Sequence, residues 1–122
     1  MLLSITQTCV AQGLVDKKGE AAGKYWGAII MADEFKKSYC GSSLNLARKW
    51  TDLPAAEKEI KNNFPASAQD EISTALSSQY ETSARADWKA RWSKIDPNKC
   101  IEARKIFYNL FDGAVQQWQT IK

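Results

Sequence analysis

The absence of histidine restricts the chemistry of this chain more than any other feature. Without histidine there is no Ser-His or Cys-His nucleophile pair, no imidazole metal ligand and no histidine pH switch. No phosphate-binding glycine loop and no nucleophile-elbow motif occurs. The carboxylates of the predicted helices mostly have lysine or arginine nearby, which is the usual pattern of a solvated face; they are Asp33, Glu34, Asp70, Glu71, Asp87 and Glu102. The sequence therefore predicts neither catalysis nor a metal or other cofactor.

An aromatic and basic group is the strongest candidate for a binding site. Trp88 and Trp92 are one helical turn apart, and Arg85, Lys89 and Arg91 surround them. Tryptophan beside arginine is typical of binding hot spots, so these five residues form a predicted protein-binding surface. In the alternative interpretation, both tryptophans pack inside the fold and the arginines are solvated.

The same two tryptophans end a stripe of residues with strict four-residue spacing. Each four-residue step overshoots a full helical turn by roughly 40°, so the stripe winds around a straight helix and cannot face one neighbour along its length. This winding favours Trp88 and Trp92 facing another helix or a partner. The stripe consists of Ile72, Leu76, Tyr80, Ala84, Trp88 and Trp92.

The cysteines bear on the compartment. Cys40 ends one predicted helix and Cys100 begins another, so the two residues would meet if those helices are antiparallel neighbours. We expect a Cys40–Cys100 disulfide, which favours a periplasmic or secreted protein; two buried thiols in a cytoplasmic protein are the alternative. Residues 1–19 are expected to be either the remnant of a secretory signal or a short helix.

Composition sets the class of the protein. The chain has 122 residues, 44% of them hydrophobic and 25% charged, which fits one globular domain. Its net charge is +3, and acidic residues are interleaved with the basic ones, which argues against a nucleic-acid partner. No apolar run is long enough to predict a transmembrane segment.

Apolar residues at three- and four-residue spacing predict helices throughout residues 20–122. We expect four main helical segments, over residues 20–40, 42–64, 67–94 and 97–119, with a fifth at 2–12. The segment 42–64 should divide into two short helices, 42–50 and 55–63. Tyr25, Trp26 and Tyr39 are expected in the core. The last helix should bury a stripe made of Cys100, Ala103, Phe107, Leu110, Ala114, Trp118 and Ile121, which Ile101, Phe111 and Val115 widen into a core-facing band. The prediction is an all-α, single-domain, irregular bundle of four to five helices.

Two short stretches resemble a known family. Lys99-Cys100-Ile101-Glu102 at the start of the last helix, and Cys40 at the end of an aromatic-rich helix, are similar to the immunity proteins that neutralise type VI secretion amidase effectors. That resemblance implies a small, periplasmic, all-α inhibitor with a disulfide. We therefore expect a non-catalytic protein-binding module, with a structural or self-assembling subunit and a small-ligand carrier as alternatives.

Overall fold

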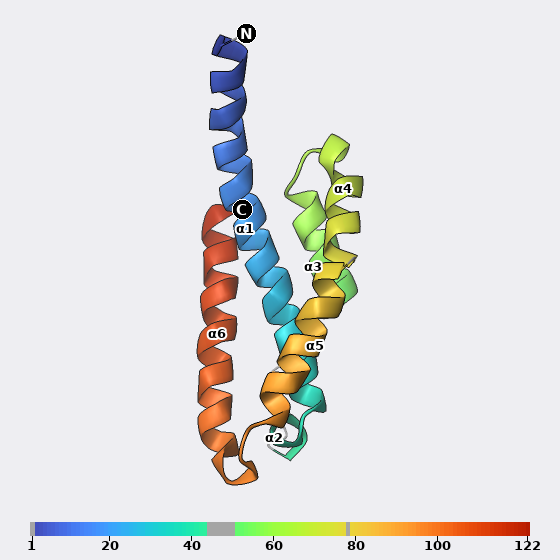
Figure 1. Cartoon of the computed structure of the whole chain (residues 1–122), viewed down its shortest axis with the longest axis vertical. Helices are drawn as coiled ribbons and strands as arrows, with labels where there is room; N and C mark the ends of the chain where they lie inside the picture. The colour runs from blue at the N-terminus through green and yellow to red at the C-terminus, as the bar shows by residue number, and fades with distance from the viewer. Residues whose placement is uncertain (1, 44–50, 78) are drawn as a thin grey trace.

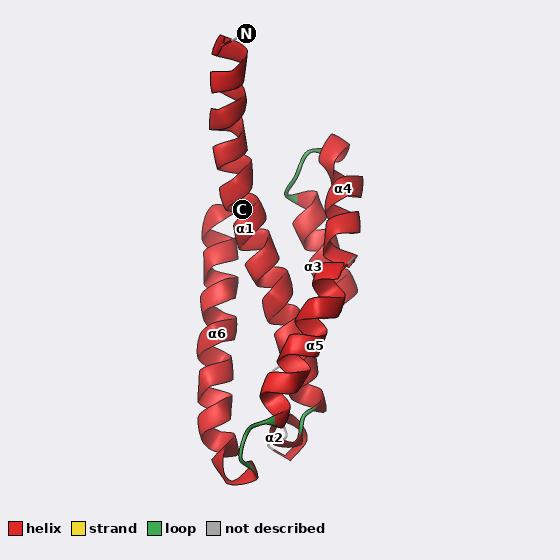
Figure 2. Cartoon of the chain, in the orientation of Figure 1, coloured by secondary structure: helices red, strands yellow, loops and turns green. Residues whose placement is uncertain are grey.

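The computed structural model describes residues 2–43, 51–77 and 79–122, with side chains over 17–43, 51–77 and 81–122 (Figure 1). These residues are almost entirely helical, and they contain no strand (Figure 2). The elements are α1 (Leu2–Lys37), α2 (Tyr39–Ser43), α3 (Leu53–Asn62), α4 (Ala66–Ser77), α5 (Gln79–Ser93), a short 3-10 turn η1 (Pro97–Lys99) and α6 (Cys100–Ile121). The predicted all-α, single-domain bundle is confirmed.

Helix α1 is the central element of the bundle. It packs against α6 on one side and α5 on another, and α6 runs antiparallel to it (Figure 1). Helix α3 packs on α1 and α4, and α4 leads into α5, which returns to the end of the bundle where α1 finishes. The N-terminal part of α1 projects beyond the other helices.

Some predicted helix bounds are wrong. The first long helix begins at Leu2 and is continuous past residue 20. The helix predicted over 67–94 corresponds to α4 and α5, and the single position between them, residue 78, lies outside the described residues. The helix predicted over 42–50 lies mostly outside the described residues. The division of the chain into 1–19 and 20–122 stays a prediction.

Ser38 ends α1 and begins α2. Its hydroxyl donates a hydrogen bond to the carbonyl of Phe35 at 2.5 Å and accepts one from the backbone N–H of Gly41 at 3.2 Å. The α2 backbone comes so close to α1 here that a Cβ atom on Gly41 would collide with the carbonyl of Phe35. This close approach is the reason for glycine at position 41.

Aspartate side chains begin two of the later elements, as the Asp-x-Pro and Asp-Pro patterns predict. Asp52 accepts a hydrogen bond from the N–H of Ala55 at 2.8 Å, with Pro54 in the first turn of α3. Asp96 accepts one from the N–H of Asn98 at 2.9 Å, and Pro97 opens η1. These caps fix where the chain turns back into α3 and α6.

The core lies along the central part of α1. Phe35 stacks against Phe107 of α6 at a centroid distance of 4.4 Å and meets Trp92 of α5 edge-on at 4.8 Å. Tyr25 and Trp26 are buried, as predicted. Tyr39 was expected in the core, but it is 65% exposed because α2 turns its side chain away from the bundle.

Candidate protein-binding surface

The five residues of the predicted binding surface lie in four different environments. Trp92 is buried, and its indole N–H donates a hydrogen bond to the carbonyl of Met31 on α1 at 3.2 Å. Arg85 points to α1, and Lys89 lines a cleft at the disulfide. Trp88 lines a separate groove, and the guanidinium of Arg91 lies over its ring. Trp92 therefore belongs to the core, as the alternative interpretation proposed for it.

Trp88 is held from two sides. Its ring stacks on Trp92 at a centroid distance of 5.2 Å with 24° between the planes. The guanidinium carbon of Arg91 lies 4.9 Å from the centre of the Trp88 ring, which is a cation–π arrangement. Arg91 is itself fixed by an ion pair with Asp87 at 3.1 Å. Trp88 is thus half-buried and positioned before any partner arrives.

A groove opens beside Trp88, between α1, α5 and α6. We call it the Trp88 groove; its volume is about 410 Å³. Small residues contribute to its lining, among them Gly27 and Ala28 from α1 and Gly113 and Ala114 from α6. Leu110 also lines it, and nothing lies within 4 Å of the position that a Gly113 Cβ atom would occupy.

The apolar surface continues along α6. Leu110 is 49% exposed and Ile106, one turn earlier on the same face, is 57% exposed. Leu110 was predicted in the buried stripe of the last helix, and this is wrong, because the helix turns Phe107 and Phe111 to the core and leaves Leu110 at its flank. The width of the apolar band on α6 could have identified this surface in the sequence, because the band is too wide to be buried by one neighbouring helix.

Arg85 joins α5 to α1 through carboxylates. Its guanidinium lies 2.7 Å from Asp33, 3.1 Å from the buried Glu34 and 3.2 Å from Glu81. Burial alone would raise the pKa of Asp33, but hydrogen bonds and charge attraction from Arg85 and Lys37 outweigh it and lower the pKa. The hydrogen bond to Asp33 is the main reason that the pKa of Arg85 is raised. Arg85 is therefore a structural ion-pair centre.

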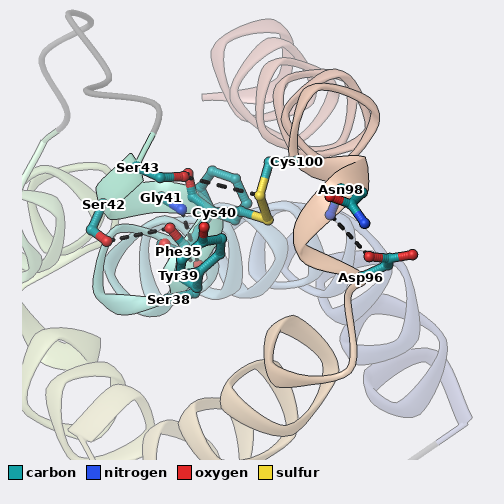
Figure 3. The surroundings of a disulfide bond; sticks show 10 residues. All are labelled: Phe35, Ser38, Tyr39, Cys40, Gly41, Ser42, Ser43, Asp96, Asn98 and Cys100. Carbon is teal, nitrogen blue, oxygen red and sulfur yellow. Dashed lines mark hydrogen bonds between the residues drawn. A yellow bond between two sulfur atoms is a disulfide. The ribbon is translucent and has the colours of Figure 1, made fainter.

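The disulfide predicted between Cys40 and Cys100 is present, with 5.0 Å between the two Cα atoms. Figure 3 shows that it joins α2 to the start of α6, next to the turn that carries Asp96 and Asn98. A cleft of about 700 Å³ lies beside it, lined in part by Lys37, Tyr39 and Lys89. Lys89 therefore faces a different part of the surface from Trp88, its neighbour in the sequence.

A further groove, of about 780 Å³, lies between α1 and the α3–α4 pair. Its lining is mainly apolar and includes Gly19, Gly23, Phe64, Ile72 and Leu76. The region of the chain that the structure describes contains no group of three or more metal-ligating side chains. None of the described helices is both long enough and apolar enough to cross a membrane.

The Trp88 groove and its surroundings form the candidate binding surface. It combines a fixed tryptophan, a groove that includes small residues and an exposed apolar face of α6. Comparison with protein-family models, with curated proteins and with solved structures found no match to this chain.

Proposed function

We propose that this chain is a non-catalytic protein-binding module that holds its partner in the Trp88 groove. The observation that carries the proposal is the position of Trp88, which lines an open groove while Trp92 and Arg91 fix its ring. An aromatic side chain that is already ordered loses little conformational entropy on binding. Tryptophan and arginine are also the residue types that contribute most to binding hot spots.

The surroundings of Trp88 support a partner of protein size. Leu110 and Ile106 extend the apolar surface beyond the groove, and small residues in the lining allow a backbone to approach closely. A partner helix with apolar residues at three- and four-residue spacing would fit such a groove. The proposed class of partner is therefore another protein.

We place this binding module in the periplasm or outside the cell. The Cys40–Cys100 disulfide supports this compartment, because stable disulfides form in oxidising environments. An inhibitor or immunity protein is the most concrete form of the proposal, since such proteins act by occupying a partner's surface without catalysis.

Filling the groove tests this proposal. Gly113→Trp places a large side chain in open space in the groove, and Gln119→Trp adds the same side chain to an exposed position on another face of α6. Wild-type and Gln119→Trp baits should enrich the same protein from the native organism, whereas Gly113→Trp and Trp88→Ala baits should lose it. With that partner purified, calorimetry should show at least tenfold weaker binding for both groove variants. Equal binding by all four proteins would refute the proposal, provided that circular dichroism shows each of them folded.

Self-association through the same groove is a second candidate. The exposed Ile106 and Leu110 favour it, because apolar side chains of this size at adjacent turns suit an interface between copies. Sedimentation of the wild-type chain should then show a dimer that Gly113→Trp dissociates. A monomer at high concentration would exclude this second function and leave the first in place.

A further inference from the structure

Charge is unevenly distributed along the bundle. At the end where the disulfide lies, α1 finishes, α2 turns, α5 finishes and α6 begins (Figure 1). Residues 36–43 and 89–105, which form this end, contain two acidic residues, Asp96 and Glu102. They contain eight basic residues: Lys36, Lys37, Lys89, Arg91, Lys94, Lys99, Arg104 and Lys105.

The rest of the described side chains have the opposite balance. Residues 17–35, 51–77, 79–88 and 106–122 contain seven basic and eleven acidic residues. The small net charge of the chain therefore conceals one basic end and a remainder with a net negative charge. We call residues 36–43 and 89–105 the basic end.

Most of these cations are not neutralised by partners within the fold. Among the described residues, no ion pair is made by Lys89, Lys94, Lys99, Arg104 or Lys105. Four of the five, all but Arg104, are exposed. Like charges at one end of the bundle repel one another, so the excess of cations there lowers the stability of the fold unless an anionic partner offsets the repulsion.

Two exposed apolar side chains accompany the cations. Tyr39, next to Cys40, is 65% exposed, and Ile101, next to Cys100, is 58% exposed. Tyr39 lines the cleft at the disulfide together with Lys37 and Lys89. Arg104 and Lys105 follow Ile101 by three and four residues, which places them on its face of α6. Each apolar side chain thus has basic neighbours, as at a protein interface with a polar rim.

We infer that the basic end is a second docking surface, which binds an acidic protein surface around Tyr39 and the cleft at the disulfide. Charge complementarity identifies the partner: carboxylates pair with Lys89, Lys99 and their neighbours, and an apolar group packs on Tyr39. The disulfide holds the two halves of this surface together, so little reorganisation accompanies binding. This docking surface is separate from the Trp88 groove, and either surface can bind a partner without the other.

Protein is favoured over other polyanions by the arrangement of the cations. Double-stranded nucleic acid favours a continuous one-signed stripe along its backbone, whereas these cations belong to one end of the bundle and lie near the exposed Tyr39 and Ile101 in the sequence. The disulfide also points to a compartment in which proteins outnumber nucleic acids.

A random peptide library displayed on phage tests the partner chemistry without assuming a partner. Peptides selected on the wild-type protein should carry an excess of aspartate and glutamate beside an apolar residue. Their binding should weaken at least tenfold in the Lys89→Glu/Lys99→Glu variant, in Tyr39→Ala and at high salt. The three substituted residues, Lys89, Lys99 and Tyr39, are all exposed, so the circular dichroism of both variants should match that of the wild type.

A matched variant separates local charge from net charge. Lys17→Glu/Lys58→Glu changes the net charge by the same amount on exposed residues outside the basic end, and it should keep wild-type affinity for the selected peptides. Trp88→Ala should also keep that affinity, which distinguishes this surface from the Trp88 groove. Peptides with no acidic excess, or an equal loss in the matched variant, would overturn the inference. Tighter binding to duplex DNA or to phosphatidylserine vesicles than to any selected peptide would overturn it as well.

Discussion

Arg85 and Glu34 form an ion pair of 3.1 Å between α5 and α1, although the Glu34 side chain is buried. Asp33 and Glu81 contact the same guanidinium, so three carboxylates share one cation. The sequence placed Arg85 on a binding surface. Its position in the structure makes it instead a residue on which the contact between two helices depends.

Removing Arg85 should therefore destabilise the fold. Arg85→Met leaves the buried carboxylate of Glu34 with Lys37, 3.9 Å away, as its remaining cation, and we expect a loss of about 2 kcal/mol, less than for a fully buried pair because Arg85 is partly exposed. Urea unfolding followed by circular dichroism measures it. Lys24→Met breaks the exposed pair with Glu20 and should cost less than about 0.5 kcal/mol. Similar losses for both variants would contradict the structural role of Arg85.

Tyr25 should limit stability at high pH. Burial, with the hydrogen bond that its hydroxyl donates to Glu59 at 2.9 Å, raises the pKa of Tyr25 from 10.0 to about 12. The folded protein thus keeps its proton while the unfolded chain releases it, so stability is full below pH 10 and is lost as the pH rises toward about 12. The loss should be on the order of 2 kcal/mol.

Tyrosinate absorbance measures this ionisation directly. The wild-type protein should show a late step near pH 12 that is missing in Tyr25→Phe, and the variant should lose less stability between pH 10 and 12. At acid pH the dependence of stability on pH has the opposite sign. Burial would raise the pKa of Glu59, but Lys122 and Tyr25 outweigh burial and lower it. The contribution of Glu59 to stability is therefore lost as the pH falls through this lowered pKa. A difference between the two titrations that lies near pH 10 would show that Tyr25 ionises normally.

Two glycines should respond in opposite ways to the same substitution. Gly41→Ala forces a Cβ atom into the carbonyl of Phe35, and we expect a loss of about 1–3 kcal/mol. Gly113→Ala places its Cβ atom in open space within α6 and should gain about 0.5–1 kcal/mol from helix propensity. Thermal unfolding of the two variants beside the wild type checks both signs. A tolerated Gly41→Ala would mean that α2 does not approach α1 so closely.

The disulfide should contribute strongly to stability. It closes a loop with a sequence separation of 60, for which the chain-entropy relation gives about 4 kcal/mol. The Cys40→Ser/Cys100→Ser variant should lose a similar amount in denaturant unfolding. A thiol assay on the denatured protein should detect one thiol without reductant and three with it. Three thiols without reductant would show that the bridge is not formed.

The helical period made most of the fold predictable. Apolar spacing identified the helices, and Asp52 and Asp96 marked two of their starts correctly. The break at Ser38 was not predicted, because it depends on a serine bonding to the backbone and on a close contact at Gly41, neither of which has a periodic signal.

The binding surface was less predictable than the fold. Neighbouring residues on one helix are separated by about 100°, so Trp88, Lys89 and Arg91 need not share a face, and here Lys89 lies apart from the other two. The basic end was hidden for a different reason. Its two segments are far apart in the sequence and come together only when the chain has folded and Cys40 has met Cys100.

The bridge between Cys40 and Cys100 also has a mechanical consequence. Helices α3, α4 and α5 all lie inside the covalent loop that it closes. If the chain is pulled by its two ends, tension passes from α1 through the disulfide into α6 and bypasses those helices. About 200 Å of extended chain then stays hidden from the force until the bridge is reduced.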